Sequence, residues 1–279
     1  MDSWVWKIAL VLGLIGAREF VRLFTPHENG EANENGKWLI ETLDSAAIAI
    51  GLVLFVIQPF LLQAFFIPSG SMEDTLQVGD RLLVSKMIYR MSDPQFQDVV
   101  VFLPPPAAGS PSHDGHVDDF IKRCIGTPGH TIEVRDRVVY RDGEPVPELY
   151  TKWSPESGLS YSYDMKIVNG VVYSREYEAP GMPGPWRRNN VPVDEAEQEF
   201  ITRAKSGVVP PGQLLMMGDH RNNSNDSHVW GFMPRENVVG KAICIFWPLN
   251  RIGLMDQISH QPPRPFRAAG TSEPIPLSQ

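Results

Sequence analysis

The chain has 279 residues, 42% of them hydrophobic, and a formal net charge of −8 at pH 7. This acidic balance argues against a general nucleic-acid binder, which needs a basic surface to displace counterions from phosphates. The 23 glycines and 25 prolines favour a turn-rich β architecture. The two cysteines, Cys124 and Cys244, are too few for a disulfide scaffold and are expected to be buried free thiols.

Two apolar segments near the N-terminus are predicted to cross a membrane. Residues 46–66 carry no charge, and as a helix they would extend about 32 Å, enough for a hydrocarbon core of about 30 Å. Residues 3–17 are apolar apart from Lys7, whose long side chain can reach the interface. A first span over 1–24 is preferred to a cleaved signal peptide, because charged residues and a stronger apolar segment follow it.

The charges near these segments indicate how they are oriented. Arg18 and Arg22 stand at the end of the first span, which favours a cytoplasmic loop over residues 25–45. No lysine or arginine follows the second span before Arg81. The large C-terminal part of the chain is therefore expected to face outward.

The rest of the chain carries strand and turn patterns. Strands are expected over 81–88, 98–103, 120–125, 131–134, 138–141, 214–217 and 238–247. Asp142-Gly143 and Asn169-Gly170 lie between apolar runs and predict hairpins, since both residues of each pair accept positive φ. Residues 194–204 are predicted to form a short helix capped by Asp194.

These patterns divide the region after the spans into parts. Residues 136–206 are rich in turns, aromatics and proline and are predicted to be an inserted β subdomain. The main, mainly antiparallel β domain is then expected over 67–135 and 207–256. Residues 257–279, with five prolines, are predicted to be a flexible tail.

Three polar segments are the candidates for chemistry. A turn with two serines, residues 67–72, follows the second apolar segment directly. The sequence Phe-Ile-Lys-Arg occupies residues 120–123, and a run of glycine, asparagine, serine and aspartate occupies 218–227. Together they suggest a serine nucleophile with a lysine base at a membrane surface.

The chemistry requires an unusual lysine. A serine hydroxyl is a poor nucleophile until a base takes its proton. Lowering a lysine pKa by roughly 3 units costs about 4 kcal/mol, which burial can supply. In a strand, Lys122 shares one face with Phe120 and Cys124, whereas Arg123 points to the other. Lys122 is therefore expected to be buried and Arg123 to be solvated.

The ordered set of segments resembles type I signal peptidases, from the first span to about Phe246. The layout of two spans followed at once by the catalytic part is similar to that of Gram-negative bacterial members. The matching residues are Ile67-Pro68-Ser69-Gly70-Ser71-Met72, Thr75-Leu76, Gly79-Asp80, Ile121-Lys122-Arg123, Gly126, Pro128-Gly129, Gly218-Asp219, Arg221, Asn223-Ser224, Asp226-Ser227 and Trp230-Gly231.

The resemblance implies specific roles for these residues. Ser71 would be the nucleophile and Lys122 the general base, with no metal or cofactor. The Ser69 hydroxyl and the Ser71 N–H would form the oxyanion hole. The substrates would be secreted precursors, cleaved after an Ala-x-Ala type junction.

It also implies the surroundings of the site. Ser224 would orient the lysine amine, and Asp226 would support that loop. Ile67 and Ile121 would line shallow pockets for small side chains. The protein would be a multi-pass protein of the bacterial inner membrane, in contact with lipid, with its β catalytic domain on the periplasmic side.

Four positions depart from the family pattern. Asp74 stands where proline is usual, His220 where asparagine is usual, and Asn222 where aspartate is usual. His228 replaces the usual arginine, so an ion pair at this position would depend on pH. The principal catalytic positions are unaltered, so activity is expected.

Other functions compete with this interpretation. Residues 113–119 hold two histidines and three aspartates and suggest a metal site, although a solvated loop is preferred. A Ser-His-Asp hydrolase could pair Ser71 with His220 or His228. A narrow-specificity serine–lysine protease that matures a pilin or a few precursors, and a non-catalytic membrane-anchored β binding domain, are further alternatives.

Overall fold

The computed structural model describes residues 3–24, 27–28, 31–32, 34–109, 118–154 and 160–256. The chain divides into two compact units, Met1–Gln63 and Ala64–Gln279, and each is described by itself. The predicted proline-rich tail over 257–279 lies outside the described residues, and so does most of the candidate metal segment, 110–117.

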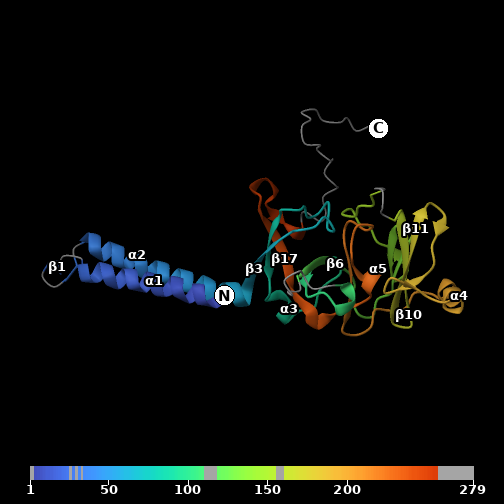
Figure 1. Cartoon of the computed structure of the whole chain (residues 1–279), viewed down its shortest axis with the longest axis horizontal. Helices are drawn as coiled ribbons and strands as arrows, with labels where there is room; N and C mark the ends of the chain where they lie inside the picture. Colours follow the sequence, from blue (N-terminus) through green and yellow to red (C-terminus); the bar gives the residue numbers. More distant parts are fainter. Residues whose placement is uncertain are drawn as a thin grey trace, which may run out of the picture. The chain divides into compact units, whose positions relative to one another are not determined.

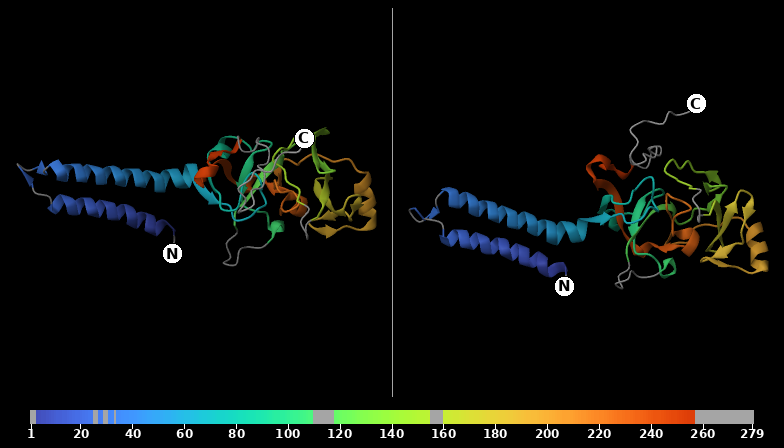
Figure 2. Two further views of the ribbon diagram at one scale, coloured as in Figure 1. Left: turned by 90° about the horizontal axis from the view of Figure 1, so that it is seen from above. Right: turned by 45° about the horizontal axis from the view of Figure 1, so that its top comes forward.

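The N-terminal unit is a pair of helices lying side by side. Helix α1 (Ser3–Phe24) is joined to α2 (Glu34–Leu52) through the two-residue strands β1 (His27–Glu28) and β2 (Glu31–Ala32) (Figures 1 and 2). Because the connection is short, the helices run antiparallel. Arg18 Nε on α1 lies 2.8 Å from Asp44 Oδ1 on α2 and ties them together.

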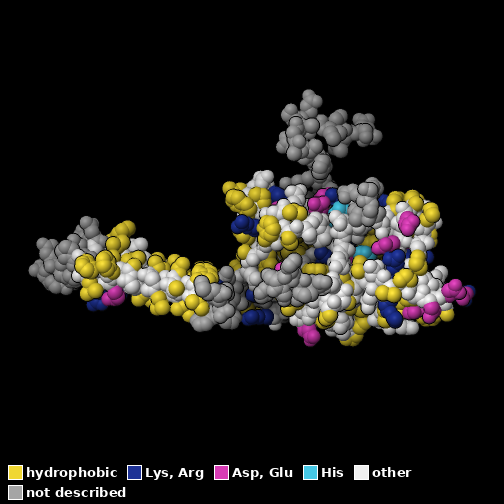
Figure 3. Space-filling model, in the orientation of Figure 1, with side chains coloured by type: hydrophobic (Ala, Val, Ile, Leu, Met, Phe, Trp, Pro, Cys, Tyr) yellow, Lys and Arg dark blue, Asp and Glu magenta, His cyan; other side chains and the backbone are white. Residues whose placement is uncertain are grey.

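The helical unit is apolar on its surface. Large side chains such as Leu12, Phe20 and Ile48 are exposed, and hydrophobic atoms cover much of the helices in Figure 3. Among the described helices, the one long and apolar enough to cross a membrane is Gly36–Phe55, with a mean hydropathy of 1.7. Helix α1 does not reach that standard. The described structure therefore gives one clear candidate span rather than two.

The second apolar segment differs from its predicted form at both ends. Helical backbone already begins at Glu34, so residues 34–45, expected in a loop, are helical. It continues as a π-helical stretch over Val53–Leu61 and gives way to strand β3 (Leu62–Phe66). Pro59 lacks the N–H that a helical residue donates. The short apolar run over 62–66 fits a helix and a strand equally well. The prediction of a helix through residue 66 was therefore wrong.

The second unit is mainly antiparallel β structure. Its first sheet has the strand order β16-β15-β6-β5-β17-β4-β3, with β18 paired to β17 (Figure 1). The strands are β4 (Arg81–Ser85), β5 (Val99–Phe102), β6 (Phe120–Gly126), β15 (Gln213–Met217), β16 (Met233–Pro234), β17 (Val238–Trp247) and β18 (Gly253–Leu254).

The second sheet lies between β6 and β15 in the chain, in the order β14-β13-β11-β10-β7-β8-β9, with β12 paired to β11. Its strands are β7 (Ile132–Arg135), β8 (Val138–Arg141), β9 (Glu144–Pro145), β10 (Ser162–Val168), β11 (Val171–Ala179), β12 (Met182–Pro183), β13 (Arg187–Arg188) and β14 (Val191–Pro192). Since β7 belongs to this sheet, the inserted segment begins before residue 136.

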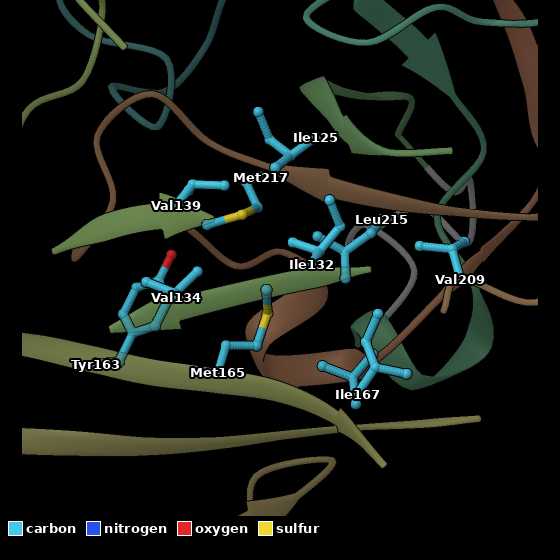
Figure 4. Close-up of a cluster of buried hydrophobic side chains, with 11 residues drawn as sticks. Ile125, Ile132, Val134, Val139, Tyr163, Met165, Ile167, Val209, Leu215 and Met217 are labelled. Carbon is cyan, nitrogen blue, oxygen red and sulfur yellow. The ribbon is translucent and has the colours of Figure 1, made fainter. Parts of the chain in front are cut away.

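One apolar core joins the two sheets. Figure 4 shows side chains of β6 and β15, including Ile125 and Leu215, packed with Ile132 and Met165 of the second sheet. Tyr163 is also buried in this cluster. The insertion is therefore continuous with the main β domain rather than a separate compact unit, because each covers apolar surface of the other.

Local signals in the insertion are confirmed. Asp142-Gly143 and Asn169-Gly170 have the positive φ values that such turns require, and they connect β8 to β9 and β10 to β11. Helix α4 (Glu195–Arg203) begins after Asp194, whose carboxylate accepts the Glu197 N–H at 2.9 Å.

The short helical elements were mostly not predicted. They are α3 (Ile88–Met91), α5 (Ser227–Trp230) and the 3-10 turns η2 (Pro106–Ala108), η3 (Arg235–Asn237) and η4 (Leu249–Arg251). The strand expected over 81–88 ends at Ser85, and helix α3 begins at Ile88. Both cysteines are free, with Cys124 buried and Cys244 only partly so.

Candidate active site

Strand β6 places a lysine in the interior. Lys122 lies opposite Val100 of β5, is 5% exposed, and its Nζ sits 5.4 Å from the centre of the Phe120 ring. Phe120 is two residues away on the same face, as strand alternation predicts. Arg123, expected to be solvated, is 1% exposed instead. The alternation assigned the two faces correctly but did not reveal that both faces of this central strand are covered.

The serine turn follows β3 and meets this lysine. The backbone of Ile67 is tied to the turn over Gly79-Asp80 by hydrogen bonds of 2.9 and 3.0 Å. Ser71 Oγ lies 2.7 Å from Lys122 Nζ, and Ser69 Oγ lies 3.5 Å from Ser71 Oγ. These are the side-chain partners of the Ser71 hydroxyl among the described residues. A hydroxyl and an amine at this distance can exchange a proton.

The surroundings prepare the lysine to act as a base. Burial lowers the pKa of Lys122 to about 8, while the carboxylates of Asp226 and Asp219 oppose the shift. A lysine with a pKa of about 8 has roughly a tenth of its amines neutral at pH 7, against less than a thousandth at the ordinary value. The site therefore holds a usable fraction of the basic form.

The loop after β15 closes around the serine. The His220 N–H donates to the Ser71 carbonyl at 3.1 Å. A Cβ on Gly218 would lie 2.5 Å from that carbonyl and 2.2 Å from Ser224 Oγ. Only glycine allows this close approach. Gly218 is thus required by packing between the nucleophile turn and Ser224, a role that the sequence analysis did not assign.

The Asp226 side chain holds the loop after β15 through a hydrogen bond to the backbone of that loop. Its carboxylate accepts the Gly218 N–H at 2.8 Å and lies 2.7 Å from His228 Nδ1. Burial by itself raises the pKa of Asp226, but His228, the Gly218 N–H and the Ser224 hydroxyl together hold it below its ordinary value. The carboxylate therefore stays charged and accepts the hydrogen bond from the loop backbone.

Ser224 lies against Gly218, next to the nucleophile turn. Its buried hydroxyl has no partner with good geometry among the described residues, although it lies near enough to Asp226 to lower the carboxyl pKa. A hydrogen bond to the lysine amine, expected from the family pattern, is not present here. Orientation of Lys122 by Ser224 remains a prediction.

A buried ion pair lies beneath the site. Arg123 donates to both oxygens of Asp219, at 2.8 Å from Nε and 2.5 Å from Nη2, and Thr75 donates to the same carboxylate at 2.6 Å. These residues come from β6, the loop after β15 and the turn after Ser71. The pair joins the segments that carry Lys122, Ser71 and Gly218. Pattern reasoning found the residues, but their pairing required the tertiary structure.

A pocket of about 370 Å³ opens beside the serine. Ile67 and Ile121 line it, together with Phe66 and Phe120. Asp119 lines the same pocket, and burial raises the pKa of its carboxyl. The volume is that of an ordinary ligand pocket, and its wall combines the apolar side chains with polar ones that include Ser71 and Lys122.

The candidate metal segment lies mostly outside the described residues, so only the serine–histidine alternative is compared with this geometry. No group of three or more histidine, cysteine, aspartate or glutamate side chains that could hold a metal occurs among the described residues. The His228 ring stacks on Tyr163 with the centroids 4.1 Å apart and faces Asp226. Neither histidine replaces Lys122 as the base hydrogen-bonded to the Ser71 hydroxyl.

Both polar atoms of the Asn222 side chain make hydrogen bonds. Its amide nitrogen donates to the carbonyls of Ser154 and Ser160 at 2.6 and 2.7 Å, and its oxygen accepts the Ser154 N–H at 3.0 Å. Aspartate could not make the two donated bonds. The asparagine therefore matches the backbone it meets, and that backbone belongs to the insertion.

We expect Asn222→Asp to lower the free energy of unfolding by about 2–4 kcal/mol, because a charge would face two carbonyls left without donors. Urea denaturation of the protein in detergent measures this change. Asn250→Asp, which adds the same charge at an exposed position, is the matched control and should change stability by less than about 0.5 kcal/mol. Equal effects of the two substitutions would contradict the assignment.

Comparisons with known proteins show which proteins this chain resembles. A family model described as signal peptidase, peptidase S26, matches residues 39–247. A probable signal peptidase I-1 of Synechocystis sp. is 34% identical over 229 residues, covering 82% of this chain and 92% of the relative. Signal peptidase I of Leptolyngbya laminosa is 33% identical over 215 residues, covering 77% of this chain and 83% of the relative.

Among solved structures, a signal peptidase I from Enterococcus faecalis aligns with a TM-score of 0.30 and 25% identity, over 54% of this chain and 97% of that one.

Proposed function

The chain belongs to the signal peptidase family, peptidase S26, and from this premise we propose that it removes signal peptides with Ser71 as nucleophile and Lys122 as general base. It is a membrane-associated serine protease that acts on signal-peptide-bearing precursors. The observation that carries the assignment of the dyad is the 2.7 Å contact between Ser71 Oγ and the buried Lys122 Nζ.

The reaction is an acyl transfer in two steps. Neutral Lys122 takes the proton of Ser71, whose oxygen attacks the carbonyl carbon of the last residue of the signal peptide. The protonated lysine then gives its proton to the leaving amine. Water, activated by the same lysine, hydrolyses the ester and releases the signal peptide.

The developing oxyanion needs donors. The Ser69 hydroxyl, 3.5 Å from Ser71 Oγ, and the Ser71 N–H are the candidates. A donor of this kind contributes about 3–4 kcal/mol to acyl transfer. Ser224 and Asp226 are proposed to keep the lysine side of the site in place.

The substrate is proposed to bind extended beside the serine turn. Backbone hydrogen bonds to an edge segment would set its register. The pocket lined by Ile67 and Ile121 would accept small side chains of the Ala-x-Ala kind. No step of this reaction calls for a metal, cofactor or nucleic acid.

The membrane arrangement is proposed from sequence charge and helix composition. The second span would lie within the helix that includes Gly36–Phe55, and α1 would form a first span with Lys7, Arg18 and Arg22 near its ends. The loop between them would be cytoplasmic, in the bacterial inner membrane. The catalytic β domain, together with the inserted sheet that begins at β7, would face the periplasm.

Contact of the β domain with lipid is a further part of this proposal. Trp247, Leu249 and Ile252, near the end of β17, are 48%, 70% and 60% exposed. Apolar side chains grouped in one stretch of chain suit an interface with lipid headgroups. The tail after residue 256 would follow this segment.

The test is cleavage by the full chain, purified in detergent, of a precursor bearing an Ala-x-Ala junction. Because Lys122 must be neutral and its pKa is about 8, kcat/KM should rise about tenfold per pH unit up to pH 8 and then level off. A chelator should have no effect. A rise centred near pH 6.5 would indicate a histidine base, and inhibition by the chelator would indicate a metal site.

The narrow-specificity alternative differs only in substrate range. A panel of precursors with different mature sequences but the same junction separates the two. Cleavage of most of the panel supports a general signal peptidase, whereas cleavage of one pilin-like precursor alone supports a dedicated enzyme. A non-catalytic binding domain does not fit membership of a peptidase family.

A further inference from the structure

The insertion contacts the nucleophile turn at Asp74 and the segment after β15 at His220, Asn222 and His228. Asp74, His220, Asn222 and His228 each meet a residue between 152 and 174, namely Lys152, Ser154, Ser160, Tyr163 or Ser174. These contacts involve charge, hydrogen bonding and ring stacking. The insertion therefore forms part of the frame around the site.

Lys152 lies at the centre of this contact. Its N–H donates to the Asp219 carbonyl at 2.8 Å, and its carbonyl accepts the Arg221 N–H at 2.9 Å. The segment therefore pairs, like a short strand, with the residues on either side of His220. Since the His220 N–H holds the Ser71 carbonyl, the backbone of the insertion is one residue away from the nucleophile turn.

The Lys152 side chain reaches the nucleophile turn directly. Its Nζ lies 3.2 Å from Glu73 Oε2 and 3.7 Å from Asp74 Oδ1. The Glu73 carboxylate in turn lies over the backbone of the turn, since a Cβ on Gly70 would be 2.8 Å from Oε1. The lysine, its partner and the turn therefore form one continuous contact that ends at Gly70, the residue before Ser71.

We propose that Lys152 is a positioning residue for the Ser71 nucleophile, acting through Glu73, so that the inserted segment takes part in holding the active site. The inference rests on the proposed role of Ser71. Glu73 and Asp74 are adjacent carboxylates, and the lysine cation offsets their repulsion. Without it, the turn would lose one of the constraints that hold Ser71 Oγ 2.7 Å from Lys122 Nζ. A displacement of about 1 Å at a reacting atom can cost about a hundredfold in rate.

A charge-swap series tests the proposal on the full chain in detergent, with the same precursor. Lys152→Glu and Glu73→Lys should each lower kcat about tenfold and leave KM within about twofold, because the nucleophile and not the substrate pocket is displaced. The double variant, which restores an opposite-charge pair, should recover most of kcat. Lys205→Glu, at an exposed lysine of the same insertion, should match the wild type.

Several outcomes would overturn the inference. Wild-type kcat in either single variant, or no recovery in the double variant, shows that the pair does not position the serine. Rates are measured well below the melting temperature of each variant. If either single variant does not fold, Lys152→Met is measured in its place, and its kcat is expected to fall about threefold. If wild type cleaves and Ser71→Ala does not, while Lys152→Glu remains fully active, only the positioning role fails. If wild type does not cleave, the proposed function fails as well.

Discussion

Replacing Ser71 or Lys122 with alanine is expected to reduce precursor cleavage by about 10⁴-fold or more, to the level left by binding and oxyanion donors alone. Ser71→Ala removes the atom that attacks the carbonyl. Lys122→Ala removes the amine at 2.7 Å and leaves the serine without a base. Cleavage is measured in detergent with a precursor bearing an Ala-x-Ala junction.

The loss must not result from unfolding, and the buried lysine provides a control. Below pH 8 the folded protein keeps a protonated Lys122 in an apolar site, whereas the unfolded chain holds the same proton in water. Between its folded pKa of about 8 and the ordinary 10.5, the unfolded state binds more protons, so stability rises with pH. The difference between the two pKa values corresponds to about 3 kcal/mol, by which the protonated lysine lowers the stability of the folded protein below pH 8.

Lys122→Met should therefore be more stable than the wild type at pH 7, by up to about 3 kcal/mol, with the advantage shrinking as pH rises towards 10.5. An inactive variant with a raised melting temperature separates catalysis from folding. Retained activity in Lys122→Ala would instead show that the lysine mechanism is wrong. His220→Ala and His228→Ala would then be examined as alternative bases.

Removing the Asp219 carboxylate is expected to have the largest effect on stability. Asp219→Ala leaves the guanidinium of Arg123 buried at 1% exposure without its paired carboxylate. Breaking such a buried pair costs about 3–5 kcal/mol, because the remaining charge is not solvated. Urea unfolding of the variant and of the wild type gives the difference.

Two further variants identify the cause. The double variant Arg123→Met with Asp219→Leu removes both charges and should recover much of the loss, since buried pairs contribute little compared with apolar packing. Asp93→Ala breaks an exposed pair with Arg235 and should cost no more than about 1 kcal/mol. A loss in Asp219→Ala no larger than in Asp93→Ala would show that Asp219 does not compensate a buried charge.

Short-range patterns predicted much of the β structure. Alternation placed Lys122 and Phe120 on one face, and the Asn-Gly and Asp-Gly pairs located two hairpins, because these features depend only on neighbouring residues. The same reasoning failed over residues 62–66. That apolar run satisfies the pattern of a helix as well as that of a strand, and pairing in a sheet decides between them.

The sequence by itself determined the chemistry available to this protein: a serine in a small-residue turn, a lysine among apolar neighbours, and a loop rich in hydrogen-bonding groups. It also specified an apolar helix near the N-terminus, since length and composition suffice for that. The tertiary structure alone decided that Arg123 is buried on Asp219, that Gly218 admits Ser224 next to the nucleophile turn, and that Lys152 meets Glu73. Each of these depends on segments brought together from distant parts of the chain, and the burial that shifts a pKa or requires an ion pair exists only after they meet.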